Sequence, residues 1–290
     1  MNGCKAEYIS VDDINSQFSM LEDMRIELGT SDDWDQLHDF HYKTETSTFG
    51  PVFYRAMMGS QLIGVCVMSY PKLLLEPRHR AFPKIKPAAD SKLTNTFRAK
   101  YINDTFAINS RSVVDTLFRG VGVSYRMLNL ASRMHNRKIL EIQSAMSKFN
   151  PFAMKAGYKF VKPKLPPAYP KGIAIFKRHF LSHPFDIESI MGELDEMSPA
   201  IYEKAISELR EFYYNNSALE KTGRNLGRTV EDMAEYSDRE IIKNIQGLAF
   251  STPLYGAYLN PDFGRELPDS LPLSAFDNQQ PNEKLRLDLL

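Results

Sequence analysis

The sequence is poor in cysteine and contains no long apolar run. Its 290 residues include two cysteines, Cys4 and Cys66, too few for the disulfide framework of a small secreted domain. No stretch approaches the roughly 20 apolar residues that cross a bilayer, and the N-terminus lacks the pattern of a signal peptide. With 43% hydrophobic residues, the chain can bury one sizeable domain and a smaller one. We therefore expect a cytoplasmic protein with no membrane partner.

A net charge is also missing, since 36 Lys and Arg balance 36 Asp and Glu, but the charges are segregated. Residues 1–71 hold 4 Lys and Arg against 11 Asp and Glu, residues 72–180 hold 22 against 5, and residues 181–290 hold 10 against 20. A strongly basic middle thus lies between two acidic blocks.

The basic charge is dense in residues 72–101, where cations alternate with Phe82, Phe97 and Tyr101. Prolines between residues 71 and 87 argue against a regular helix there. One interpretation is a loop that faces nucleic acid, because cations displace counterions from phosphates and aromatic rings stack on unpaired bases. The other is that the acidic blocks fold against this region and neutralise it. Both stay open.

A glycine loop lies between a β-rich run and a helical pattern. Residues 112–118 favour a strand, Arg119 to Ser124 form the loop, and residues 125–137 favour a helix. Glycines let backbone amides approach an anion closely, and the first turn of the helix offers unpaired donors. The loop therefore predicts a pyrophosphate site, although two glycines can also mark a simple turn.

A second strand and a short helix follow. Residues 138–145 are β-like, and Asn150 is a good N-cap with Pro151 at the first helical position. Gly157 fits the left-handed position that ends such a helix. Together these motifs resemble the core of the GNAT superfamily of N-acetyltransferases, whose signature is Arg/Gln-x-x-Gly-x-Gly/Ala, then a strand and an Asn-led helix ending in Gly-aromatic.

The resemblance implies a mixed, mostly antiparallel α/β sheet with flanking helices, and acetyl-CoA as the cofactor. Arg119, Gly122 and Ser124 fill the signature, with Ser124 in place of the usual small residue. A backbone amide at Val114, on a splayed strand, would polarise the thioester carbonyl. The implied cofactor-binding residues are Ser112, Val113, Val114, Arg119, Gly120, Val121, Gly122, Val123, Ser124 and Asn150.

The catalytic groups are less well defined. Many GNAT members carry a tyrosine that protonates the departing thiolate, and here that position is Ala153. Either Tyr125 or Tyr158 serves instead, or the thiolate leaves unassisted, or the chain binds acyl-CoA without turnover. His41 is the candidate base because an imidazole titrates near neutral pH, and Tyr42 could orient it or act as the acid. No metal is expected.

A narrower resemblance lies in the N-terminal part. Trp34-x-x-Leu37-x-x-Phe40-His41-Tyr42-Lys43, followed by residues 62–71, is similar to the branch that includes phage Mom-like DNA-modification proteins and acetyltransferase domains attached to ABC ATPases. This likeness implies a nucleobase or other nucleic-acid amine as acceptor. A small-molecule or protein amine remains the alternative, as does a non-catalytic, CoA-binding or structural subunit.

The remaining sequence gives the domain organisation. Residues 25–28, 51–57 and 62–70 favour strands, and residues 34–43 favour a helix. Beyond residue 180, apolar residues from Ile201 to Tyr213 form a stripe at helical spacing. We predict an N-terminal arm (1–24), a GNAT-like domain (25–180), a helical extension (181–250) and an irregular C-terminal arm (251–290). The last two could bind a partner or mediate oligomerisation.

Overall fold

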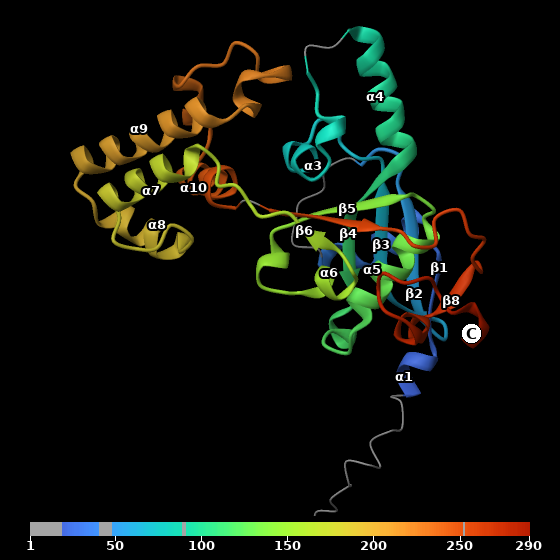
Figure 1. Cartoon of the computed structure of the whole chain (residues 1–290). Helices are drawn as coiled ribbons and strands as arrows, with labels where there is room; N and C mark the ends of the chain where they lie inside the picture. The colour runs from blue at the N-terminus through green and yellow to red at the C-terminus, as the bar shows by residue number, and fades with distance from the viewer. Residues whose placement is uncertain (1–18, 41–47, 89–90, 252) are drawn as a thin grey trace, which may run out of the picture. The chain divides into compact units, whose positions relative to one another are not determined.

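The computed structural model describes residues 19–40, 48–88, 91–251 and 253–290, and it divides into two units (Figure 1). The first unit comprises residues 1–161 together with 254–290, and the second comprises residues 162–253. The boundaries of the helical unit therefore lie at residues 162 and 253, whereas the sequence predicted residues 181 and 250. The segment after residue 253 returns to the first unit.

An eight-stranded sheet forms the centre of the first unit, in the order β6-β7-β5-β4-β3-β2-β1-β8. Every neighbouring pair is antiparallel except β4 and β5, which are parallel. The mixed, mostly antiparallel α/β fold predicted from the sequence is therefore confirmed. The strands are β1 Met24–Leu28, β2 Val52–Met58, β3 Gln61–Ser69, β4 Phe106–Val114, β5 Ile139–Ser144, β6 Lys159–Phe160, β7 Leu254–Leu259 and β8 Ser270–Pro272.

Helices cover both faces of this sheet. α5 (Val123–Met134) buries Met127, Leu128 and Ala131 in the main core, together with Cys66 of β3. α2 (Ser31–Leu37) packs Leu37 against Val65 and Val67, which alternate with Cys66 along β3. Because successive side chains of a strand point to opposite faces, α2 and α5 lie on opposite sides of the sheet. The short helices α1 (Ser19–Glu22) and α6 (Phe152–Lys155) complete this part.

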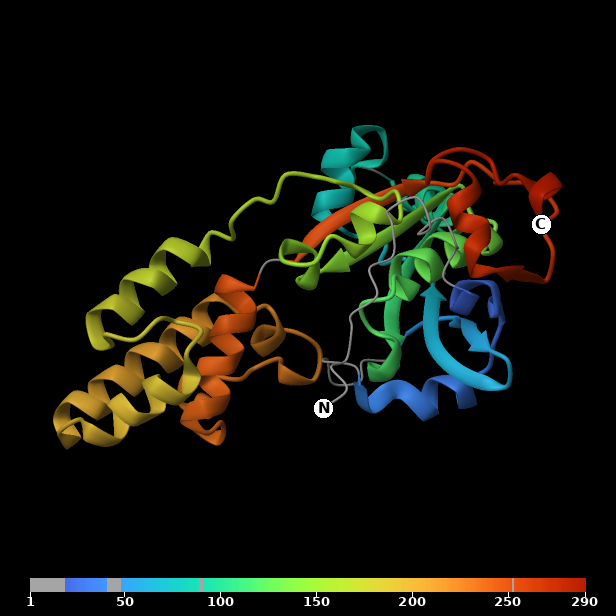
Figure 2. The same ribbon diagram turned by 90° about the horizontal axis from the view of Figure 1, so that it is seen from below.

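The C-terminal segment was expected to be an irregular arm, but it supplies two strands of the sheet. β7 lies between β5 and β6, and Figure 2 shows it in orange beside the light-green β5. β8 extends the opposite edge of the sheet by pairing with β1. Residues 281–283 are held by α5, because the buried guanidinium of Arg133 pairs with Asp262 and donates to the carbonyls of Pro281 and Glu283. These pairings join residues far apart in sequence, which local patterns do not reveal.

A buried ion pair fixes the segment after β3 to the sheet. The Nε and Nη2 atoms of Arg78 lie 2.6 and 2.5 Å from the two carboxylate oxygens of Glu141, and both side chains are fully buried. Arg78 Nη1 also donates to the carbonyl oxygen of Lys72 at 2.5 Å, and the Tyr255 hydroxyl donates to Glu141. The pair thus connects α3 (Glu76–Ala81) with β5 and β7.

Residues 72–101 are more regular than predicted. Beside α3 they contain a 3₁₀ turn, η3 (Pro83–Ile85), and the start of the 14-residue helix α4 (Lys92–Thr105). The prolines do not interrupt these elements, because Pro77 and Pro83 occupy first-turn positions and no proline lies within α4. The Ser91 hydroxyl caps α4 by accepting from the Thr94 amide at 3.2 Å.

Other predicted elements are shifted. The strand expected at residues 112–118 is β4, which ends at Val114 because the Asp115 carboxylate accepts from the Leu117 amide and begins the turn η4 (Thr116–Phe118). The helix expected at residues 34–43 is α2, which begins earlier at a Thr30–Asp33 capping box and continues as η2 (His38–Phe40). Residues 41–43 lie outside the described part of the chain.

The second unit is helical and has its own core. Its helices are α7 (Ala168–His179), α8 (Ile187–Glu196), α9 (Pro199–Asn216) and α10 (Asp238–Ile245). The predicted stripe on α9 is buried from Ala205 to Tyr213, whereas Ile201 is exposed. No helix in the described ranges is long and apolar enough to cross a membrane.

Replacing Arg78 with Met should destabilise the first unit by about 3–5 kcal/mol, because the Glu141 carboxylate would stay buried without its partner. The free energy of unfolding from denaturant titration measures this effect. The double variant Arg78→Met/Glu141→Leu should recover most of the loss, since it removes both charges. Equal destabilisation by the single and double variants would contradict the assigned role of the pair.

A second prediction concerns pH. Burial, and then the charge of Arg137, lowers the pKa of His135 from 6.5 to about 4, and its ring lies 3.2 Å from the Tyr54 hydroxyl. Between pH 6.5 and 4, His135 therefore binds a proton more readily in the unfolded chain than in the folded chain. The free energy of unfolding should consequently fall as the pH drops from 6.5 to 4. The slope from this group approaches about 1.4 kcal/mol per pH unit. His135→Gln should flatten the denaturation-derived profile across that window, and an unchanged profile would contradict the assignment.

Candidate functional site

The site begins where β4 and β5 separate. The parallel pairing runs from Phe106 opposite Ile139 to Asn109 opposite Ile142, and there it stops. β4 continues along β3 to Val114, while β5 continues along β7 to Ser144. The β3–β4 register shifts between Asn109 and Arg111, which makes Ser110 an extra residue on β4 at the point of separation. A wedge therefore opens between two strands of one sheet.

Backbone groups of β4 face this wedge. The Asp115 amide donates to the Ile63 carbonyl at 2.9 Å, so these two residues form a hydrogen-bonded pair. Pairs alternate along an antiparallel ladder, which makes the neighbouring Val114–Gly64 pair non-hydrogen-bonded. The Val114 amide consequently points away from β3, toward the space that β5 has left. Its carbonyl accepts from Arg119 Nε at 3.2 Å.

The glycine loop leads into the N-terminus of α5. Gly120 and Gly122 have φ values of +92° and +87°, which favour glycine. A side chain at Gly122 would also lie 2.3 Å from Arg126 Nη1 and 2.8 Å from the Tyr125 hydroxyl. The first-turn amides of α5 have no partner within the helix and lie at the positive end of its dipole. This backbone arrangement suits an anion.

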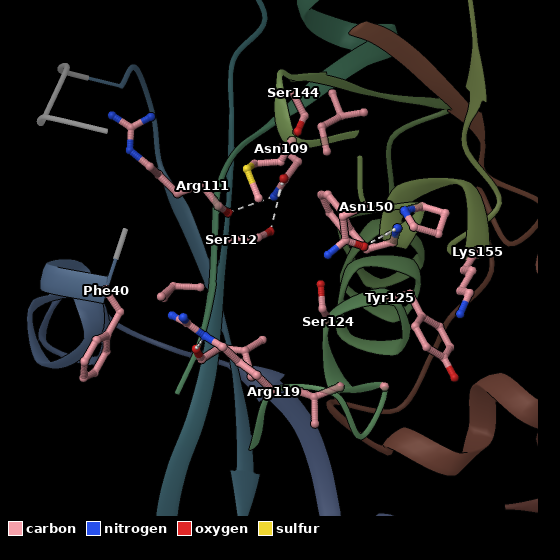
Figure 3. A pocket seen from close by; sticks show the side chains of 18 of the residues that line it. Phe40, Asn109, Arg111, Ser112, Arg119, Ser124, Tyr125, Ser144, Asn150 and Lys155 are labelled. Carbon is pink, nitrogen blue, oxygen red and sulfur yellow. Dashed lines mark hydrogen bonds between the residues drawn. The ribbon is translucent and has the colours of Figure 1, made fainter. Parts of the chain in front are cut away.

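A cavity of about 510 Å³ occupies the wedge and the space before α5 (Figure 3). Its charged lining residues are Arg111, Arg119 and Lys155, and no carboxylate is among the described residues that line it. Nine of the ten predicted cofactor-binding residues line this cavity, and Val121 does not. Besides these nine and the three cations, the lining comprises Phe40, Asn109, Ser110, Phe118, Tyr125, Ile142, Gln143, Ser144, Met146, Pro151 and Phe152.

The labelled side chains differ in where they point. In Figure 3, Ser112 on β4 and Ser124 on α5 lie on either side of the cavity, and Asn150 approaches from a third side. Tyr125 points away from both serines and lies beside Lys155, whose Nζ is 5.6 Å from the centre of the tyrosine ring. Tyr125 is thus at the edge of the cavity.

Asn150 acts at the start of α6. Its Oδ1 accepts from the Phe152 amide at 3.1 Å, but the N-cap of this four-residue helix is Pro151, so the predicted cap is displaced by one residue. The helix ends in a Schellman motif, in which the Tyr158 amide donates to the Ala153 carbonyl and the Gly157 amide to the Met154 carbonyl.

This motif explains why Tyr158 does not line the cavity. The residue after the left-handed glycine typically packs inward, and Tyr158 is buried with its hydroxyl 2.7 Å from Ser132 Oγ. Burial raises the pKa of this phenol well above its ordinary value. Ala153 is also fully buried. The structure therefore places the Tyr158 hydroxyl in the core, which removes the basis for predicting it as a catalytic acid.

The candidate base has no described position, since His41 and Tyr42 lie in the 41–47 segment outside the described residues. The preceding residue, Phe40, lines the cavity at the end of η2. The chain therefore enters that segment from the cavity wall.

Sequence reasoning missed Asn109 and Lys155. The Asn109 amide donates to Cys66 Sγ at 3.1 Å and to the Arg111 carbonyl at 2.9 Å, which holds β4 at the point of separation. Burial raises the pKa of Cys66 to about 12, so this sulfur remains a thiol. Lys155 could have been found from its place four residues after Pro151, on the helix that follows Asn150.

Comparisons with known proteins add little to this geometry. No protein-family model matches the chain, and no curated protein matches it. Among solved structures, the apo form of a mutant agmatine N-acetyltransferase superposes with a TM-score of 0.31 and 12% identity, over 49% of this chain and 86% of that chain. A likeness of this size carries no conclusion about activity.

Substitutions at Asn150 should separate its hydrogen bond to the Phe152 amide from ligand binding. Asn150→Ala should lower the free energy of unfolding by about 1 kcal/mol through loss of this hydrogen bond. Asn150→Asp retains the accepting oxygen but adds a negative charge to a cationic cavity, so stability should hold, while binding of coenzyme A, the ligand expected from the sequence, should weaken. Calorimetric titration and denaturation measure the two effects. Equal coenzyme A affinity of the Asp variant and the native chain would show that Asn150 lies away from the ligand.

Proposed function

We propose that this protein is an acyl-CoA-dependent N-acyltransferase, with acetyl-CoA as the donor. The observation that carries the proposal is the cationic cavity between the separated ends of β4 and β5, which reaches the glycine loop at the start of α5. An elongated anion with one reactive end suits such a cavity. The diphosphate would bind at the amides near Gly122, and the acyl end would lie in the wedge.

The donor fits the residues present. Coenzyme A carries a diphosphate and a further phosphate, and Arg111, Arg119 and Lys155 supply the positive charges around the cavity. The left-handed Gly122 leaves its backbone accessible, which a side chain would obstruct. When bound, acetyl-CoA would supply the thioester whose acyl group passes to an amine.

Residues of the chain would serve the transfer in two ways. The Val114 amide, directed into the wedge, would donate to the oxygen on which negative charge develops. Arg119, which bonds the Val114 carbonyl, would hold that segment in place. Ala153 is buried, Tyr158 lies in the core, and Tyr125 points away from the wedge, so the thiolate would leave without a tyrosine acid from the described cavity wall.

The residues of the cavity wall bear on the choice of acceptor. An alkylamine is protonated at neutral pH and must lose a proton before it attacks, which requires a base. No carboxylate is among the described lining residues, so His41 is our proposed base, oriented by Tyr42. An exocyclic nucleobase amine is already neutral, so no proton has to leave before it attacks, and its proton would pass to the base as the new bond forms. We therefore propose a nucleic-acid amine as acceptor, with a small-molecule or protein amine as the second candidate.

Acetyl-CoA should bind the native chain, and Gly122→Ala should weaken this binding at least about tenfold, because the new methyl group displaces Arg126 and Tyr125 and obstructs the loop backbone. A left-handed alanine also costs about 1–2 kcal/mol in stability. Gly227→Ala is the matched control, since Gly227 has φ +94°, no neighbouring atoms within 4 Å, and a place in the helical unit. Isothermal titration calorimetry gives the affinities.

Turnover is tested by release of the free thiol with a panel of amines, including single-stranded oligonucleotides. Tyr125→Phe should leave kcat within about twofold, because this phenol points away from the wedge, and a large fall in kcat would assign it the role of acid. Binding without thiol release for any amine would favour the non-catalytic alternative. Absence of acetyl-CoA binding at millimolar concentration would overturn the proposal.

A further inference from the structure

Helix α4 extends well beyond the core that anchors it. Its buried residue is Ile102, which packs with Phe106 and Ile139 in a small cluster joined by Phe82 and Ile85. Every residue from Lys92 to Phe97 is exposed. Figure 1 shows the N-terminal half of α4 projecting from the sheet of its unit. About half of this helix therefore makes no contribution to the core of the first unit.

The projecting part carries an exposed apolar line. Leu93, Phe97 and Tyr101 follow one another at intervals of four residues, which places them on one face on successive turns. Their exposed fractions are 65%, 63% and 51%. Large side chains aligned and exposed in this way mark an interaction surface more often than scattered single residues do. We call these three residues the α4 stripe.

Exposed lysines lie on two sides of α4, one next to the stripe and two near Ile102, which is about 140° around the helix from Phe97. At about 100° per residue, Lys100 lies about 60° around the helix from Phe97 and is exposed. Lys84 and Lys86 are exposed on either side of Ile85, which packs against Ile102 of α4. Burial, and then Arg78, Arg98 and Lys86, lower the pKa of His79 on α3, while Glu76 raises it.

Among the described residues of the segment, the acidic side chains are Glu76 and Asp104. Glu76 pairs with Arg80 at 3.1 Å, and Asp104 lies in the last turn of α4, four residues after Lys100. Arg78 is neutralised by Glu141 inside the protein. The exposed lysines therefore dominate the surface beside the exposed aromatic rings.

We propose that the α4 stripe, with Lys84, Lys86 and Lys100, binds single-stranded nucleic acid. The combination of exposed aromatic rings and lysines matches a flexible polyanion with planar bases, because unpaired bases stack on Phe97 and Tyr101 while the lysines contact phosphates. A regular duplex keeps its bases stacked on each other and offers nothing to these rings. The proposal does not depend on the acyltransferase function.

Fluorescence anisotropy of a labelled single-stranded 20-mer with the full chain tests this surface. Binding should weaken steeply as salt rises, in proportion to the number of phosphate contacts. Phe97→Ala and Tyr101→Ala should each weaken binding by about tenfold or more. Phe263→Ala, which changes another half-exposed aromatic residue of the same unit, should leave it unchanged.

Two double charge-reversal variants test how much the lysines contribute to binding. Lys84→Glu/Lys86→Glu should weaken binding and reduce the salt slope, while Lys204→Glu/Lys243→Glu, an equal charge change at exposed lysines of the helical unit, should have a smaller effect. All variants should bind acetyl-CoA like the native chain, so failure of this proposal is distinguishable from failure of the acyltransferase.

Three outcomes would overturn the proposal. Duplex DNA or polyphosphate bound as tightly as the single strand would show a charge effect without stacking. Unchanged binding by both aromatic variants would place the strand elsewhere. Self-association of the native chain that Phe97→Ala abolishes, without any oligonucleotide binding, would identify a second copy of the chain as the partner.

Discussion

The separation of β4 from β5 is the constraint on which the site depends. Two parallel strands that stay paired would use their backbone groups on each other, whereas here the pairing ends at Asn109 and Ile142. The cost of unpaired edges is limited on both sides, because β3 continues to hold β4 and β7 continues to hold β5. Ser110 supplies the extra residue that bends β4 away. The wedge therefore exists because each strand keeps a partner on its other side.

The segregated charges are distributed in a way that neither initial interpretation describes fully. Arg133 and Arg126 of the basic middle are paired with Asp262 and Asp277 of the acidic C-terminal block, as the neutralising interpretation requires. Arg78 instead finds Glu141 within its own block. Cations also line the wedge, where no described carboxylate faces them, and stand exposed beside α4. Pairing builds part of the fold, and further cations lie along the wedge and beside α4.

Local signals in the sequence predicted local structure well. The glycine loop, the β2–β3 hairpin, the Asn150 hydrogen bond at the start of α6 and the helix-ending Gly157 depend on a few neighbouring residues, and each is present in the structure. β7 could not be predicted in this way, because its pairing with β5 joins residues more than 100 positions apart. The prediction of Tyr158 as a catalytic residue lost its basis for a similar reason. The direction of the Tyr158 side chain is set by the Schellman motif and by the core around Ser132. Proximity in the chain to a functional motif did not place its hydroxyl in the cavity.

The two proposals meet in the chemistry of the acceptor. A cavity wall with three cations and no described carboxylate favours anionic ligands and disfavours a cationic alkylamine, which like charges would repel. A nucleobase amine brings no positive charge, and the phosphates of its strand are attracted by the same field that attracts the donor. Exposed aromatic rings on α4 would hold unpaired bases, the form in which an exocyclic amine is accessible. Electrostatics alone therefore favours a donor and an acceptor that are both negatively charged, with the reacting amine neutral.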